Sequence, residues 1–284
     1  MNAGEIFKKI RKERNLTQKK VAEGVCSHQI VSDFEKKGQE ISYLSFYGLI
    51  KNIGVSLDEF QYELNQYKLS EWERILEQAT DLFFEKDING LKTLLKNEIK
   101  KTKNLPYGHD LNCLMIKNLL SKINDETVMS EEEKNQIKDY LTAIEHWGYY
   151  ELTLFNNTID IFSPTVLILL VNEFYKKIEF YSEVFHNKNL TILISINIMG
   201  KLIEFKEFEE AKIIKGTIYK NIKENQILYK NLFLFACGYL DFSTNKKNEG
   251  IQKMKRAIFV FKIVESNNLA LTYRNAFNEI VNEK

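Results

Sequence analysis

Proline and glycine are scarce in this chain of 284 residues, which contains 2 prolines and 12 glycines. Because proline breaks helices and glycine weakens them, this scarcity favours long uninterrupted helices. Turn dipeptides between alternating strands, the usual sign of β-hairpins, do not recur. The Asn89-Gly90 pair lies among helix-forming residues. The sequence therefore predicts an all-α protein.

Cysteine is scarce as well. Cys26, Cys113 and Cys237 are far apart, odd in number and without metal-ligand spacing, which favours free thiols in a reducing cytoplasm over disulfides or a metal site. The four histidines are isolated in the sequence, and the glycines have neither dinucleotide-binding nor P-loop spacing. We therefore expect no metal and no cofactor. No catalytic constellation is recognisable, so an enzyme is not expected.

Long apolar runs are also missing. The most apolar stretch, residues 165–171, is too short to span a bilayer, and the polar N-terminus does not resemble a signal peptide. We expect a cytoplasmic protein without a membrane partner. The net charge is only +1, but residues 1–38 contain nine basic and five acidic side chains, whereas residues 67–284 contain thirty of each. A basic excess at one end is what a nucleic-acid partner would need.

Five short helices are expected at the N-terminus, where apolar residues recur at helical spacing behind capping residues. The pattern places them at residues 3–13, 17–25, from 27 onward, 42–54 and 56 to about 66. The last begins with Ser56-Leu57-Asp58-Glu59, which has the form of a capping box.

A second capping box, Ser70 to Glu73, follows directly and suggests a domain boundary. We predict a first domain at residues 1–66, a short ordered linker at 67–71 and a second domain at 72–284. In the second domain apolar residues keep recurring three and four positions apart, which predicts roughly nine to eleven further helices. Another capping box begins at Ser130.

Two segments of the second domain look like parts of tetratricopeptide units. One begins at Phe208 and contains Ala211, and the other contains Gly250, 39 residues later. Small residues at these positions would let paired helices approach closely. We expect tetratricopeptide-like helical repeats, with an irregular helical bundle as the alternative.

The most specific pattern extends from Leu16 to Phe60. It reads Leu16-Thr17-Gln18, Val21-Ala22, Cys26-Ser27, Val31-Ser32, Phe34-Glu35, Gly38 and 54–60. The order resembles the phage-repressor type of helix-turn-helix, although the turn Val25-Cys26-Ser27 is one residue shorter than usual. The alternative is a small helical domain with a solvated basic face.

A helix that enters the major groove needs short polar residues near its N-terminus, and Ser27, His28, Gln29 and Ser32 have this placement. Gln29 could bind adenine, and Asp33 would face cytosine or solvent. The resemblance implies that Gln18 contacts the DNA backbone and braces Gln29. Phosphate contacts are expected from Lys36 and Lys37, with Lys8, Arg11 and Lys12 as further candidates. Glu35 is expected to pair with Arg11 or Arg14. The candidate DNA-binding residues are Thr17, Gln18, Ser27, His28, Gln29, Ser32, Lys36 and Lys37.

With the second domain included, the chain resembles regulators of the Rgg/MutR family, within the class of Gram-positive peptide-pheromone receptors. The resemblance rests on Cys26-Ser27, Ser32 to Lys36, Ile41-Ser42 and the segment 147–157. It implies a homodimeric transcriptional regulator that binds double-stranded DNA. It also implies helical repeats around a groove that binds a short linear signalling peptide, as in quorum sensing.

An extended peptide exposes backbone N–H and C=O groups, and asparagine side chains can satisfy both. The candidate peptide-binding residues are Tyr149, Tyr150, Asn156, Asn157, Asn172, Tyr175, Asn197 and Asn231. Three alternatives remain for the second domain: a sensor of another protein or a small molecule, a dimerisation scaffold, or an enzyme.

Overall fold

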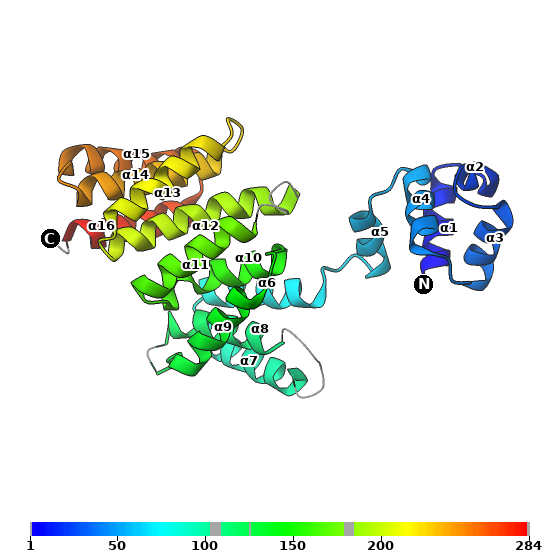
Figure 1. The fold of residues 1–284 in the computed structure, drawn as a ribbon, viewed down its shortest axis with the longest axis horizontal. Coiled ribbons are helices and arrows are strands. Elements are labelled where there is room, and N and C mark those ends of the chain that lie inside the picture. The colour runs from blue at the N-terminus through cyan, green and yellow to red at the C-terminus, as the bar shows by residue number, and fades with distance from the viewer. Residues whose placement is uncertain (1, 103–108, 125, 179–184, 283–284) are drawn as a thin grey trace. The chain divides into compact units, whose positions relative to one another are not determined.

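The computed structural model describes residues 2–102, 109–124, 126–178 and 185–282, and every regular element in these ranges is a helix (Figure 1). The all-α prediction is confirmed. The chain divides into two compact units, Met1–Gln78 and Ala79–Lys284. The expected linker, residues 67–71, precedes this division, which falls inside helix α6 (Glu71–Phe84).

Five helices precede α6 in the first unit. They are α1 (Ala3–Glu13), α2 (Gln18–Ala22), α3 (His28–Lys37), α4 (Tyr43–Ile53) and α5 (Leu57–Leu64). Each begins behind a residue whose side chain accepts a hydrogen bond from a first-turn N–H group that has no partner within the helix. These capping residues are Asn2, Thr17, Ser27, Ser42 and Ser56.

Two helices of the first unit are shorter than the sequence predicts. Helix α2 ends at Ala22 rather than near residue 25, because Gly24 has a φ of 73°. Helix α5 ends at Leu64 rather than near residue 66, because Gln66 and Tyr67 have φ values of 56° and 60°. A right-handed helix cannot continue through such left-handed residues.

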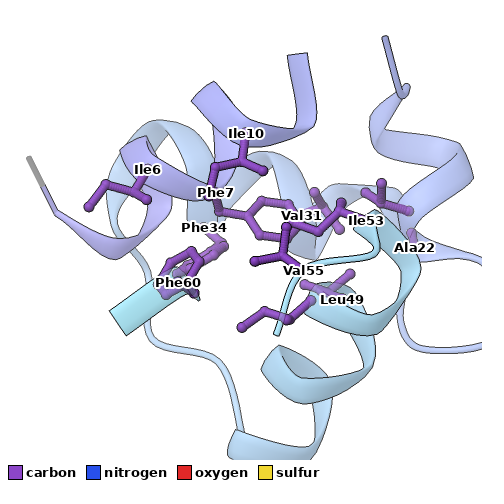
Figure 2. Close-up of a cluster of buried hydrophobic side chains, with 12 residues drawn as sticks. Ile6, Phe7, Ile10, Ala22, Val31, Phe34, Leu49, Ile53, Val55 and Phe60 are labelled. Atoms are coloured by element: carbon purple, nitrogen blue, oxygen red, sulfur yellow. The ribbon is translucent and has the colours of Figure 1, made fainter. Parts of the chain in front are cut away.

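The first unit has one core, to which α1, α3 and α4 contribute their apolar faces. Figure 2 shows Phe7, Val31 and Leu49 inside this cluster, and all three are fully buried. Phe60 joins the cluster from α5. Full burial of each such side chain stabilises the fold by about 1.5–3 kcal/mol. The packing thus fixes α3 against α1.

The second unit is a series of helices that pack on their neighbours (Figure 1). After the end of α6 follow α7 (Ile88–Thr102), α8 (His109–Ser121), α9 (Glu131–Ala143), α10 (Tyr149–Thr158) with the 3-10 turn η1 (Ile159–Ile161), α11 (Pro164–Lys177), α12 (Phe185–Glu204), α13 (Phe208–Asn221), α14 (Ile227–Ser243), α15 (Lys247–Ile263) and α16 (Asn267–Asn282). Helices α8, α10, α12 and α14 contact one another in that order. In the described ranges, no helix is both long and apolar enough to cross a membrane.

Four connections in this series have the same geometry, which confirms the helical-repeat prediction. Each is three residues long, and the central residue is left-handed: Lys86, Lys206, Asn245 and Glu265, with φ from 56° to 69°. In all four, the next residue donates its N–H to the carbonyl five residues earlier, at 2.9 Å. This is the Schellman arrangement that closes a helix and reverses the chain.

Helices α14 and α15 lie against each other at two glycines. A Cβ atom on Gly250 would lie 2.5 Å from the carbonyl oxygen of Gly238, and one on Gly238 would lie 2.8 Å from the carbonyl oxygen of Gly250. No real Cβ atom tolerates these distances. Gly250 therefore acts as the sequence predicts, and Ala211 is likewise fully buried in α13.

The C-terminal end of α9 is held by two side chains from later segments. The Lys177 ammonium donates to the carbonyl oxygens of Leu141 and Thr142, at 3.2 and 2.6 Å, and also pairs with Glu173 at 2.8 Å. The buried Trp147 donates its indole N–H to the Leu141 carbonyl at 2.9 Å. These donors satisfy carbonyl groups that the helix itself leaves without partners.

Candidate nucleic-acid interface and candidate peptide-binding surface

The turn between α2 and α3 is built by local caps and by one residue from α4. Thr17 accepts the N–H of Lys20 at 3.1 Å, and Ser27 accepts the N–H of Ile30 at 3.4 Å. From α4, the side-chain nitrogen of Asn52 donates to the carbonyls that end α2, those of residues 21 and 23, at 2.8 and 2.9 Å. Asn52 was not predicted from the sequence, because nothing local marks a contact across about thirty residues.

The candidate DNA-binding residues differ in exposure. Seven of the eight are exposed or half-buried: Thr17, Gln18, Ser27, His28, Gln29, Lys36 and Lys37. Ser32 is 9% exposed, and α3 turns it toward the core with Val31 and Glu35. A side chain so covered cannot reach a base edge, so we remove Ser32 from the candidate reading residues.

A buried ion pair joins α1 to α3. Arg11 donates to both carboxylate oxygens of Glu35, at 2.6 and 2.7 Å, and also donates to the carbonyl of Leu16. The sequence expectation that Glu35 pairs with Arg11 or Arg14 is confirmed for Arg11. The same contacts remove Arg11 from the candidate phosphate contacts, because its guanidinium has no surface left for DNA.

The two glutamines have different partners here. Gln18 donates its side-chain nitrogen to Glu35 at 2.8 Å, so the same carboxylate orients both Gln18 and Arg11. Gln29 donates to the Asp33 carboxylate at 3.1 and 3.2 Å. The Lys37 ammonium lies 2.8 Å from Asp33. Hydrogen bonds from Lys37, and to a lesser extent from Gln29, hold the pKa of Asp33 below its usual range.

Several candidate peptide-binding residues serve the packing of the second unit instead. Asn231 is buried and donates to the Ala257 carbonyl at 3.0 Å, which links α14 to α15. The hydroxyl of Tyr150 donates to Asn112 in α8 at 3.0 Å. Burial also raises the pKa of Tyr150. We therefore exclude Asn231 and regard Tyr150 as a link between α8 and α10.

Two further candidates contact neighbouring helices. Tyr175 donates its hydroxyl to Ser195 at 2.9 Å, and burial raises the pKa of this tyrosine. It lines a cavity of about 240 Å³ between α11, α12 and α13. The backbone carbonyl of Asn157 accepts a hydrogen bond from Asn118 of α8 at 2.7 Å. Asn172 is exposed on α11.

One pair of candidates comes together on the surface. Asn197, exposed on α12, donates its side-chain nitrogen to the side-chain oxygen of Asn156 on α10 at 2.9 Å. This contact uses one polar atom of each amide and leaves the Asn156 nitrogen and the Asn197 oxygen for another group. Tyr149, at the start of α10, is 40% exposed. These three residues define the amide surface of α10 and α12.

Among the described residues, no three His, Cys, Asp or Glu side chains are grouped so that they could hold a metal ion. The three cysteines are free thiols. Burial raises the pKa of Cys113 and Cys237 to about 11.

Comparisons with known proteins agree with this architecture. The family model for the C-terminal domain of the HTH-type transcriptional regulator Rgg matches residues 92–275, and a helix-turn-helix model matches residues 7–60. The second match contains α2 and α3 with the turn between them. The family consists of transcriptional regulators, not enzymes.

Solved structures share the fold over nearly the whole chain. The SHP pheromone receptor Rgg2 of Streptococcus dysgalactiae has a TM-score of 0.84 at 24% identity, covering 98% of this chain and 99% of Rgg2. PrgX in its complex with iCF10 has a TM-score of 0.74 at 16% identity, covering 98% and 95%. PlcR of Bacillus thuringiensis, in complex with the peptide PapR7 and DNA, has a TM-score of 0.66 at 18% identity, covering 97% and 98%. The family-model match over residues 92–275 decides the identity: the chain belongs to the Rgg family of helix-turn-helix transcriptional regulators.

Proposed function

We propose that α3 enters the major groove of DNA, with His28 and Gln29 at the base edges. Both side chains are exposed at the N-terminal turn of the helix, from which a reading helix reaches bases. The remaining candidates would contact phosphates: Thr17, Gln18, Ser27, Lys36 and Lys37. Residues 1–66 would form the reading domain, joined through residues 67–71 to a sensing and dimerising domain at 72–284, in the cytoplasm.

Gel-shift titration over a range of salt concentrations tests the proposed DNA contacts of α3. The DNA is an operator selected from random duplexes. Gln29→Ala should relax the base preference at one position. Lys36→Ala should weaken binding to all sequences and reduce the salt slope by about 1. Lys220→Ala, an exposed lysine of α13, is the matched control and should change neither. Equal losses for Gln29→Ala on selected and random duplexes would contradict base reading.

We also infer that the second unit binds a short linear peptide across α10 and α12. The hydrogen-bonded pair of Asn156 and Asn197 carries this inference, because its remaining nitrogen and oxygen offer one donor and one acceptor side by side. A backbone amide of an extended peptide presents the complementary acceptor and donor. The exposed ring of Tyr149 supplies apolar area on the same helix as Asn156. Rgg2 is described as a pheromone receptor, and PlcR was solved with a peptide, which supports a peptide ligand here.

Isothermal titration with short apolar peptides encoded beside the gene tests peptide binding. Asn156→Ala and Asn197→Ala should each weaken binding about ten-fold, the effect of one lost hydrogen bond. Asn248→Ala, an exposed asparagine at the start of α15, is the control. Sedimentation should show a homodimer, which would present two reading helices to half-sites about 34 Å apart. A dimer that binds none of the peptides would favour the scaffold alternative.

A further inference from the structure

Helix α3 carries a row of three polar side chains spaced one turn apart. Gln29, Asp33 and Lys37 are four residues apart and therefore share one face of the helix. The two carboxylate oxygens of Asp33 lie 3.2 and 3.1 Å from the side-chain nitrogen of Gln29, and one of them lies 2.8 Å from the Lys37 ammonium. The Asp33 side chain is only 19% exposed, whereas Lys37 is 68% exposed. Asp33 therefore anchors both neighbours while remaining largely covered.

This anchoring decides which atom Gln29 presents. Because the amide nitrogen donates to Asp33, the amide oxygen of Gln29 points away from the carboxylate. An amide oxygen and a carboxylate can only accept hydrogen bonds. In the major groove, adenine N6 and cytosine N4 are donors, whereas guanine O6 and thymine O4 are acceptors. Gln29 held in this way presents its oxygen as an acceptor, and the neighbouring carboxylate repels bases that carry only acceptors there. The remaining N–H of the amide can still donate, for example to adenine N7, so adenine and cytosine are favoured over guanine and thymine.

In the proposed complex Asp33 would lie close to the negatively charged phosphates, and Lys37 offsets the resulting repulsion. Its ammonium neutralises the charge of Asp33, and the hydrogen bond between them lowers the pKa of the carboxyl group. The carboxylate therefore remains an acceptor at neutral pH. A protonated Asp33 could donate to the Gln29 oxygen and free the Gln29 nitrogen for guanine or thymine, and the discrimination would be lost.

We propose that Asp33 is a positioning residue that sets the base preference of Gln29 and restricts the base opposite it to adenine or cytosine. The inference rests on the proposed function of α3 as the reading helix. It goes beyond that function because it assigns the specificity to a residue that need not touch DNA.

Selection from randomised duplexes followed by sequencing tests the inference on the full-length protein. The wild type should enrich a motif with adenine or cytosine at the position that Gln29→Ala relaxes. Asp33→Asn can donate its amide N–H to the Gln29 oxygen and so turn the Gln29 nitrogen toward the base. Guanine or thymine at that position should then gain about five-fold while the rest of the motif is unchanged. Asp33→Ala should lose the same discrimination. Asp58→Asn, which removes an exposed carboxylate of α5, should leave the motif as it is.

Two results would overturn the inference about Asp33 but leave the proposed reading function of α3 intact. In the first, Asp33→Asn strengthens binding to all duplexes equally, so that Asp33 contributes only bulk charge. In the second, the position relaxed by Gln29→Ala holds guanine or thymine in the wild type. If the wild type enriches no motif, the proposed reading function fails as well, which distinguishes the two failures. Circular dichroism melting of each variant verifies that its motif comes from a folded protein.

Discussion

Arg11 and Glu35 form a two-pronged ion pair between α1 and α3, and the side chains are only 9% and 0% exposed. Removal of one partner of a buried pair leaves the other charge without compensation and typically costs about 3–5 kcal/mol. Here Gln18 would also lose its acceptor. The Glu35 carboxylate therefore fixes α3 against α1 and orients Gln18 at the start of α2.

We expect Glu35→Gln to destabilise the first unit by about 3 kcal/mol. Hydrogen exchange of backbone amides in α1 and α3 of the full chain measures this loss. The matched control is Glu23→Gln, since Glu23 pairs with Lys20 on the surface at 3.1 Å, and it should change protection by less than about 0.5 kcal/mol. Unchanged protection in Glu35→Gln would show that the pair does not stabilise the unit.

Lys177 should be important for stability even though lysines are usually solvated. Lys177→Met keeps the apolar stem but removes the donor to two carbonyls at the end of α9, and we expect a loss of about 2–3 kcal/mol. Urea denaturation followed by tryptophan fluorescence measures it, because Trp147 donates to the same end of α9. The neighbouring Lys176 is exposed, so Lys176→Met should be almost neutral. Equal midpoints for the two variants would disprove the capping role.

Two glycines of the second unit should respond oppositely to alanine. Gly250→Ala places a methyl group against the backbone of α14 and should destabilise the unit by about 1–3 kcal/mol. In α13, Gly216 has open space around it, so Gly216→Ala should stabilise by about 0.5–1 kcal/mol through helix propensity. Thermal melting of both variants checks the signs. A gain in Gly250→Ala would mean that α14 and α15 are not held as closely as described.

The buried thiols predict a loss of stability at alkaline pH. Cys113 and Cys237 have pKa values near 11, against 9.0 for an ordinary thiol, so the unfolded chain releases these protons first. The free energy of unfolding should therefore fall as the pH rises from about 9 to 11. Urea midpoints compared between the wild type and Cys113→Ala/Cys237→Ala isolate this effect, since all other groups are shared. Parallel pH profiles for the two proteins would exclude it.

Local patterns were sufficient to predict much of this protein. The caps at Thr17, Ser27 and Ser56 lie within a few residues of the N–H groups that they bind, so spacing alone identifies them. The close approach at Gly250 was foreseeable because a small residue recurs in a repeat. The family resemblance then indicated the order of the two domains.

The details of the candidate sites were not predictable in this way. Asn231 and Ala257 are 26 residues apart, and Tyr150 and Asn112 are 38 apart, so helical periodicity gives no sign that they meet. Asp33 was expected to face cytosine or solvent, but it binds Gln29 and Lys37. Whether an asparagine serves packing or a ligand depends on the helix opposite it. Which helix lies opposite is determined by how the repeats stack on one another.

The four matching turns of the second unit have a consequence for engineering. Lys86, Lys206, Asn245 and Glu265 adopt backbone angles that suit glycine. A side chain with a Cβ atom costs about 1 kcal/mol there, and less for Asn245, because asparagine tolerates the left-handed region. Glycine at each of these positions would release that strain, and widely separated sites add nearly independently. Glycine substitutions in these connections should therefore raise the melting temperature, and the connections lie outside both proposed binding surfaces. A thermostable version could be designed without altering the residues proposed to bind DNA or peptide.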